Sequence, residues 1–162
     1  MYDSYFERFA GLKNYFAFVF KKASFKHYIQ FNNITKRKYF IPFNSPFIEY
    51  ATADPQTREG FEYRKAAAEI QRFSQNYPIQ GSAADCTKLA AIYIYNEIVK
   101  NNWFDIVKII NIVHDEIEVE CPEHMKDTIA KLVKNSMEKA GDIFCKIVKL
   151  TASIDIGDHW IH

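Results

Sequence analysis

Apolar residues recur at intervals of three and four along much of the chain, which is the spacing of one helix face. Four segments show it: residues 3–31, 61–75, 81–100 and 123–145. Pro78 falls between the second and third segments, and a proline deep in a helix removes a hydrogen bond and clashes with the preceding turn. The pattern therefore predicts four helices, with a break or kink at 76–78.

Other segments have the alternation or the β-branched content of strands. Residues 107–113 and 116–121 predict an antiparallel pair, and residues 147–156 predict a final strand. The segment ITKRKYFIPF, residues 34–43, predicts a short hairpin or extended segment, and residues 44–60 predict an irregular loop. The fold class that we predict is α+β, a small antiparallel sheet with long helices packed on one face.

The turn inside the predicted strand pair carries ionisable side chains and no glycine. It lies in IVHDEIEVE, residues 112–120, with His114, Asp115 and Glu116 at its tip. Alternation in EIEVE places the isoleucine and valine on the core face, so a carboxylate at the tip is held firmly and stays exposed. Adjacent carboxylates repel each other unless a cation lies between them, and Mg²⁺ prefers oxygen ligands. A metal site is one interpretation, and a solvated polar turn is the other.

A second polar pattern lies in RFSQNYPIQGSAAD, residues 72–85. Arg72, Asn76 and Gln80 recur every four residues and share one stripe of a helix. Their side chains are hydrogen-bonding groups suited to base edges and backbone oxygens, and in a minor groove they would read shape more than sequence. A merely solvated stripe would tolerate lysine or glutamate equally well, and the pattern alone leaves both interpretations open.

Charge is distributed unevenly, although the net charge of the 162 residues is only +1. Residues 1–50 hold eight Lys and Arg against three acids, with many aromatic residues between them. Residues 111–127 hold six acids and one lysine. The basic half would suit a polyanion and the acidic cluster a metal cation, while an ordinary solvated helix face also explains the basic half.

The overall composition is that of one ordinary globular domain, or a piece of one, with 48% hydrophobic and 25% charged residues. The scattered cysteines, Cys86, Cys121 and Cys145, indicate reduced thiols and disfavour a zinc site. No apolar run is long enough to span a bilayer, and the first residues lack the pattern of a signal peptide. These features predict an intracellular, cytoplasmic protein without a membrane partner, and a phage- or plasmid-encoded source is compatible with them.

Taken together, the two polar motifs resemble the polymerase domain of family A DNA polymerases. The segment R-x-x-x-N-x-P-I-Q-G-S-A-A-D and the later I-V-H-D-E-I-x-V-E, the family's motif C, stand in the family's order and spacing. Residues 5–16, residues 35–42 and the ending Gly157 to Trp160 are also similar to the family. The resemblance covers nearly the whole chain. It implies a partial polymerase domain over 1–162, with fingers-derived helices and a basic hairpin or loop in 1–75 and a palm segment in 76–162.

The resemblance implies a role for each matched residue in Mg²⁺-dependent nucleotidyl transfer from deoxynucleoside triphosphates to a DNA primer. Asp115 would be the palm aspartate that binds catalytic Mg²⁺, Glu116 its acidic neighbour, and His114 a contact to the primer terminus. Arg72, Asn76 and Gln80 would lie along the minor groove of the primer–template DNA. These six residues are the candidate site of the chain.

The family's chemistry needs a second aspartate, from motif A, and a nucleotide-binding helix, both of which lie upstream of the region that matches Tyr5. We therefore expect a second chain to carry the missing motifs and the isolated chain to be inactive. We also expect self-association, because apolar surface that met the upstream part would be exposed.

Two other hypotheses stay open at this stage. The chain could be a non-catalytic nucleic-acid-binding or scaffold protein derived from a polymerase, which would bind DNA in a salt-sensitive way without incorporating nucleotides. A free-standing Mg²⁺-dependent hydrolase built on the acidic hairpin is the weaker alternative, because no second inward-facing carboxylate is evident at a fixed distance.

Overall fold

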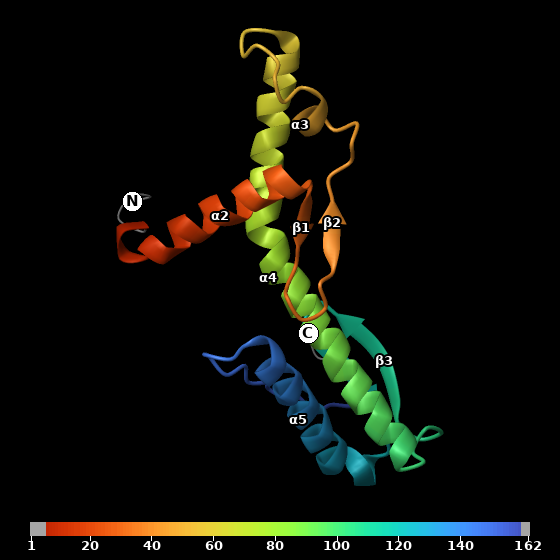
Figure 1. The fold of residues 1–162 in the computed structure, drawn as a ribbon. Helices are drawn as coiled ribbons and strands as arrows, with labels where there is room; N and C mark the ends of the chain where they lie inside the picture. Colours follow the sequence, from red (N-terminus) through yellow and green to blue (C-terminus); the bar gives the residue numbers. More distant parts are fainter. Residues whose placement is uncertain (1–5, 160–162) are drawn as a thin grey trace. The chain divides into compact units, whose positions relative to one another are not determined.

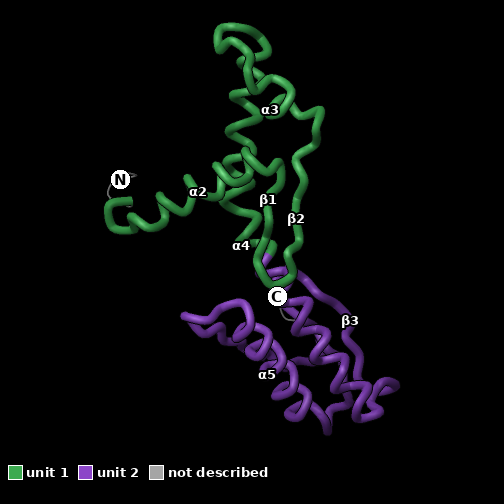
Figure 2. Tube along the Cα trace, in the orientation of Figure 1, with its two compact units in different colours: residues 1–81 green, residues 82–162 purple. Residues whose placement is uncertain are grey.

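The computed structural model describes residues 6–159 and divides into two compact units, one ending at Gly81 and one beginning at Ser82. Figure 1 shows the order of the elements, and Figure 2 shows the two units in different colours. One long helix, α4, contributes residues to both units. The elements are α2 (Ala10–Lys26), β1 (Tyr28–Gln30), β2 (Lys38–Phe40), α3 (Pro46–Glu49), α4 (Arg58–Lys100), β3 (Lys108–Val113), β4 (Glu116–Glu120), the 3₁₀ turn η1 (Glu123–Met125) and α5 (Lys126–Phe144).

The first predicted helix is shorter than expected, because α2 ends at Lys26. His27 adopts the left-handed conformation with φ of 54°, and its N–H donates to the Ala23 carbonyl, which closes the helix. The chain then turns into β1, and Ile29 at its centre is buried. The prediction of a helix to residue 31 was therefore wrong at its end, since the buried isoleucine belongs to a strand.

The extended segment predicted at 34–43 is confirmed as β2, and its partner strand is β1. The two strands pair antiparallel with Ile29 opposite Tyr39 (Figure 1). These two residues face a core that joins α2, the hairpin, α3 and α4. Its buried members are Ala23, Ile29, Ile41, Phe47 and Ile70.

The stretch 44–60 is more ordered than predicted. Pro46 begins the short helix α3, and the Ser45 hydroxyl accepts a hydrogen bond from the Phe47 N–H at 3.3 Å, as an N-cap does. The long helix α4 begins at Arg58, before the glycine at which we expected the loop to end. The irregular-loop prediction therefore holds only between these two helices.

Helix α4 runs without a break from Arg58 to Lys100, with Pro78 inside it. Of the break or kink predicted at 76–78, the break is therefore wrong. An internal proline costs about 3 kcal/mol, but the residues before it are held by aromatic packing. The rings of Phe73 and Tyr77 stack with centroids 4.8 Å apart, and Tyr39 of β2 meets Tyr77 edge to face at 5.1 Å. Tertiary packing thus overrides the local signal.

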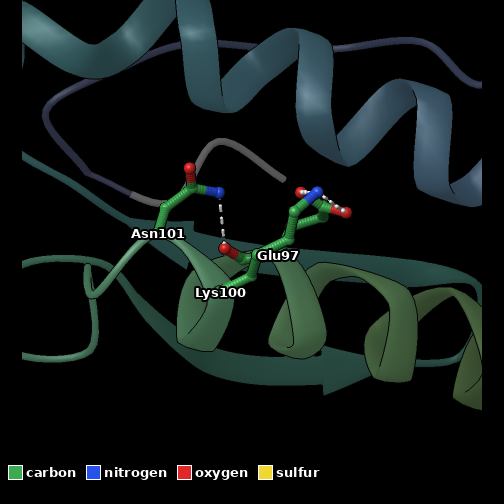
Figure 3. A network of polar contacts seen from close by, with 3 residues as sticks. All are labelled: Glu97, Lys100 and Asn101. Atoms are coloured by element: carbon green, nitrogen blue, oxygen red, sulfur yellow. Dashed lines mark hydrogen bonds and ion pairs between the residues drawn. The ribbon is translucent and has the colours of Figure 1, made fainter.

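The end of α4 is where the sequence predicts it. The side-chain amide of Asn101 donates to the Glu97 carbonyl at 2.8 Å, and the Lys100 ammonium lies 3.3 Å from the Glu97 carboxylate (Figure 3). Asn102 then adopts a left-handed φ of 56°, and the Trp103 N–H donates to the Ile98 carbonyl. These contacts satisfy the last carbonyls of the helix.

The second unit packs α4 and α5 against the β3–β4 hairpin. Its buried core consists of residues from α4, the loop before β3, and α5: Ile94, Ile98, Val107, Ile129 and Val133. Ile117 and Val119 of β4 pack against it, as the alternation predicts. The α+β class with helices on one face is confirmed, although the described residues form two separate two-stranded sheets.

The final strand predicted at 147–156 is absent from the described residues, and this prediction was wrong. The backbone of Ala152 is instead bound by side chains of α5. Its carbonyl accepts from the Lys134 ammonium at 2.6 Å, and its N–H donates to the Glu138 carboxylate at 3.4 Å. The N–H and carbonyl of Ala152, which a neighbouring strand could have paired, thus form hydrogen bonds with side chains of α5 instead.

The remaining global predictions concern the cysteines and the membrane. All three cysteines are free thiols and half-buried. Within residues 6–159, no helix combines the length and the hydropathy that crossing a bilayer requires. Trp160, which was part of the resemblance, lies outside the described residues, as does Tyr5.

Candidate active site

The tip of the β3–β4 hairpin is a two-residue turn formed by His114 and Asp115. Val113 pairs with Glu116, which leaves only these two residues between the strands. His114 has a φ of 50°, and two-residue hairpins use a positive φ at this position because it matches the twist of the strands. Histidine is among the few residue types enriched there besides glycine. Histidine is therefore tolerated at this position, and His114 and Asp115 are the two adjacent residues of the turn.

A bulge in β3 sets which side chains face the core. Ile109 pairs with Val119 and Ile112 with Ile117, while the register shifts between residues 109 and 111. Ile109 and Ile112 are three residues apart, so a regular strand would point them to opposite faces. The extra residue, Ile110, corrects the phase and is left 58% exposed. Ile109, Ile117 and Val119 therefore pack against the core, whereas Ile112, closer to the tip, is 44% exposed.

The candidate residues at the tip are all accessible. His114, Asp115 and Glu116 are exposed, and the structure places the three next to one another. Asp115 and Glu116 also line a cavity of about 1140 Å³ in the second unit. Other walls of that cavity come from α4, α5 and residues 150–159. Within the described part of the chain, no three His, Cys, Asp or Glu side chains are grouped to hold a metal ion.

Two thiols on the walls of this cavity are poor ligands in their present environment. Burial raises the pKa of Cys86, with the nearby Cys145 adding to the effect, and burial also raises the pKa of Cys121. Both stay protonated near neutral pH, whereas metal ions bind thiolates. Carboxylate oxygens, among them those of Asp115 and Glu116, are therefore better donors to a hard cation in this cavity than the two thiols.

The polar stripe is confirmed in its geometry. Arg72, Asn76 and Gln80 all lie on α4 and are exposed. Since α4 is continuous, their spacing of four residues keeps them on one side of the helix. The stripe belongs to the first unit and the hairpin tip to the second.

The sequence did not predict a contact between the loop that joins β1 to β2 and the part of α4 near Gly81. The Arg37 guanidinium donates to the Gly81 carbonyl at 3.3 Å and lies over the Phe31 ring at 4.7 Å. Phe31 in turn packs edge to face on Tyr77, with centroids 6.0 Å apart. Close packing occurs at Gly81, where an added Cβ would lie 2.5 Å from the Phe31 ring. The only sequence signal was the glycine within an otherwise helical pattern.

The chain belongs to DNA polymerase family A, because the model of that family matches it over residues 1–162. It is 37% identical to DNA polymerase I of Streptococcus pneumoniae serotype 4 over 138 residues, which are 85% of this chain and 14% of that protein. It is 32% identical to DNA polymerase I of Lactococcus lactis subsp. lactis over 158 residues, 98% of this chain and 16% of that protein.

A solved structure has the same fold. The POL domain of Pol1 from M. smegmatis, determined in complex with DNA primer-template and dNTP, matches with a TM-score of 0.60 and 28% identity. The match covers 84% of this chain and 21% of that one. The chain therefore spans only about one seventh to one fifth of the length of these proteins.

Proposed function

We propose that this chain contributes the Asp115 carboxylate and a set of DNA contacts to a DNA-directed DNA polymerase. The observation that carries the proposal is the hairpin tip, in a chain of family A. Asp115 occupies a two-residue turn whose strands are anchored in a packed core, so its position is fixed while its side chain stays exposed. A carboxylate that must meet a metal ion and a substrate needs both properties.

The residues at the tip fit Mg²⁺ by the chemistry of their donors. Asp115 and Glu116 supply carboxylate oxygens, and both line the cavity of the second unit. Asp115 would hold the ion, with Glu116 close to it and less essential. When bound, Mg²⁺ neutralises developing charge and lowers the pKa of the hydroxyl that attacks a phosphate.

The remaining candidate residues bind and orient the DNA in this proposal. The His114 imidazole, fixed by the left-handed turn, would hydrogen-bond to the primer terminus. Arg72, Asn76 and Gln80 would follow the minor groove of the primer–template duplex along α4, where their donors can reach base edges and sugar oxygens. Deoxynucleoside triphosphates are the second substrate.

A second polypeptide segment completes the active site in this proposal. It would carry the motif A aspartate and the nucleotide-binding helix, and it would cover apolar side chains on the hairpin such as Ile110 and Ile112, which are 58% and 44% exposed. Self-association of the isolated chain would use the same apolar surface.

The test is reconstitution of primer extension with a family A segment that carries these motifs. We expect Mg²⁺-dependent extension with the natural chain and a loss of about a thousandfold with Asp115→Asn, since a metal ligand contributes several kcal/mol to the transition state. Asp105→Asn is the matched control, because Asp105 is an exposed aspartate in the loop before β3 that does not line this cavity. Extension that survives Asp115→Asn would refute the role of Asp115.

The same experiment separates this proposal from a non-catalytic role. A DNA-binding or scaffold protein would bind primer–template DNA with every plausible partner segment present and incorporate no nucleotide. Loss of that binding on Arg72→Ala and Asn76→Ala, without dependence on Mg²⁺, would favour the scaffold.

A further inference from the structure

Helices α4 and α5 pack antiparallel in the second unit. Ile94 and Ile98 of α4 share one buried core with Ile129 and Val133 of α5. Helix α5 begins beside the C-terminal end of α4 and runs back along it (Figure 1). The last turn of α5 is therefore brought towards the part of α4 with which the unit begins.

That end of the helix pair carries two cysteines. Cys86 lies about two turns before Ile94 on α4, and Cys145 follows directly after α5, about three turns beyond Val133. The side chains buried on these two stretches are small: Thr87, Ala90, Ser136 and Ala140. Small side chains let two helices approach closely, so the two cysteines lie at the same end of a tightly packed pair.

The backbone of Cys145 marks the point where α5 stops. Its N–H donates to the Gly141 carbonyl at 2.8 Å, while its φ of −116° and ψ of 91° are those of an extended residue. The chain then folds back over the helix, since a Cβ added at Gly141 would lie 2.8 Å from Cβ of Leu150. Cys145 thus joins a rigid helix to a non-helical segment, and a small change in its extended backbone redirects its thiol.

The two thiols are free, half-buried and close enough to affect each other. Burial raises the pKa of Cys86, and the electrostatic effect of Cys145 raises it further. The third thiol, Cys121, has its pKa raised by burial without a contribution from another cysteine. Partial exposure leaves Cys86 and Cys145 open to a small reagent.

We infer that Cys86 and Cys145 form a reversible intramolecular disulfide when the chain meets a low-molecular-weight disulfide such as oxidised glutathione. One cysteine thiolate attacks the disulfide of the oxidant, which forms a mixed disulfide and releases one glutathione thiol. The other cysteine attacks that mixed disulfide, which forms the protein S–S bond and releases the second glutathione thiol. The two protein thiols lose two electrons and two protons, and the two glutathione thiols gain them. The inference needs neither DNA nor a metal ion and is independent of the proposed function.

The bond would join α4 to the end of α5 and to the residues that follow it. Residues 150–159 form one wall of the cavity that Asp115 and Glu116 line, and Cys86 lies on another wall. A link at Cys145 therefore fixes the start of the first wall to α4. It also closes the chain between the two cysteines into a loop, which restricts the unfolded state and stabilises the fold.

The experiment treats the full chain with oxidised glutathione in a mildly alkaline buffer, because the thiolate is the reacting form. Mass spectrometry after trypsin digestion identifies the bond, since the three cysteines lie in separate tryptic peptides, 73–88, 109–126 and 140–146. We expect peptide 73–88 joined to peptide 140–146, and separation of the two by dithiothreitol. The linked chain should melt about 5–10 °C above the reduced chain.

The chain offers a matched control in Cys121→Ser, because Cys121 is also half-buried and lines the same cavity as Cys86. This variant should form the link as fast as the natural chain. Cys86→Ser and Cys145→Ser should form no link and should keep a glutathione adduct on the remaining partner, and circular dichroism should show all three variants folded. In concentrated urea the natural chain should form the link at least about tenfold more slowly, because the effective concentration of one thiol at the other falls.

Four results would overturn the inference. The first is separate glutathione adducts on Cys86 and Cys145 with no joined peptide, and the second is a bond from either of them to Cys121. The third is linking that is equally fast in urea, which would show that the fold does not bring the two thiols together. The fourth is a bond found only in dimers on a non-reducing gel, which would place it between two copies of the chain.

Discussion

Replacing Gly81 with alanine tests the packing between α4 and the basic hairpin. The new Cβ would lie 2.5 Å from Cγ and Cδ2 of Phe31 and 2.9 Å from its Cβ. Carbon atoms in contact prefer about 3.5–4.0 Å, so Phe31 would have to withdraw by about 1 Å. Cγ and Cβ are close to the backbone, so a simple ring rotation cannot relieve the clash. Such overpacking costs about 1–3 kcal/mol.

A second effect has the opposite sign, because alanine is a better helix former than glycine by about 1 kcal/mol. Gly11→Ala in α2 isolates that effect, since an added Cβ there has nothing within 4 Å. We expect Gly11→Ala to raise the free energy of unfolding by up to about 1 kcal/mol. Gly81→Ala should lie about 1–3 kcal/mol below Gly11→Ala, because the propensity gain is common to both variants.

Urea denaturation followed by circular dichroism at 222 nm measures both variants, and the melting temperature should change by about 2–4 °C per kcal/mol. In a Phe31→Ala background the two contacts of 2.5 Å disappear and only the contact of 2.9 Å with Cβ of residue 31 remains, so the deficit of Gly81→Ala relative to Gly11→Ala should shrink. Equal stability of Gly81→Ala and Gly11→Ala in the otherwise natural chain would show that Phe31 does not pack on Gly81, and the reasoning would be refuted.

Two further predictions concern α5 and the hairpin tip. The hydrogen bond from Lys134 lowers the pKa of Glu138, and the hydrogen bond from the Ala152 N–H lowers it further. The Glu138 carboxylate therefore stabilises the fold fully above the ordinary glutamate pKa of about 4.3. This stabilisation is lost as the pH falls through the lower pKa of the folded state. Glu138→Gln should therefore lower the melting temperature at pH 7, and the difference should shrink as the pH is lowered through the acidic range; a difference independent of pH would contradict this. His114→Gly should raise the free energy of unfolding by about 0.5–1 kcal/mol, because glycine adopts the φ of 50° without a Cβ clash, and urea denaturation that shows a loss would contradict it.

Local signals in the sequence predicted those elements whose partners are close by in the chain. The β3–β4 pair, the helix from 123 and the end of α4 at Asn101 were all confirmed. Each is specified by its own period or by a capping residue within a few positions. Such elements can be predicted from the sequence because they do not depend on contacts with distant residues.

The errors arose where distant contacts decide. Pro78 reads as a helix break, but rings at Phe73 and Tyr77, packed on a strand some forty residues earlier, keep α4 continuous. Ile29 reads as part of a helical period, although its burial is in the β1–β2 hairpin. Residues 147–156 have strand composition, but the backbone of Ala152 is bound by α5. The spacing of apolar residues along the chain cannot predict any of these long-range interactions.

For the candidate site, the sequence predicted which residues lie together on one helix or one turn. It could not predict contacts between residues of two different elements. Arg72, Asn76 and Gln80 were predicted as a stripe because they share one helix, and His114 with Asp115 as a tip because they share one turn. The pairing of Tyr28 with Phe40 could not be predicted, since it depends on which strand pairs with β2.

The hairpin tip itself shows a conflict between local preference and composition. A two-residue turn with a positive φ at its first position is most easily made with glycine, and the chain uses His114 instead. A residue that accepts unfavourable backbone geometry without helping the core is best explained by the use of its side chain. The His114 imidazole is exposed and is not part of the buried core, so the natural chain is expected to be less stable than His114→Gly without a packing gain at this position. If the proposed contact to the primer terminus is correct, the same variant should be more stable and less active, and that opposition separates a functional histidine from an incidental one.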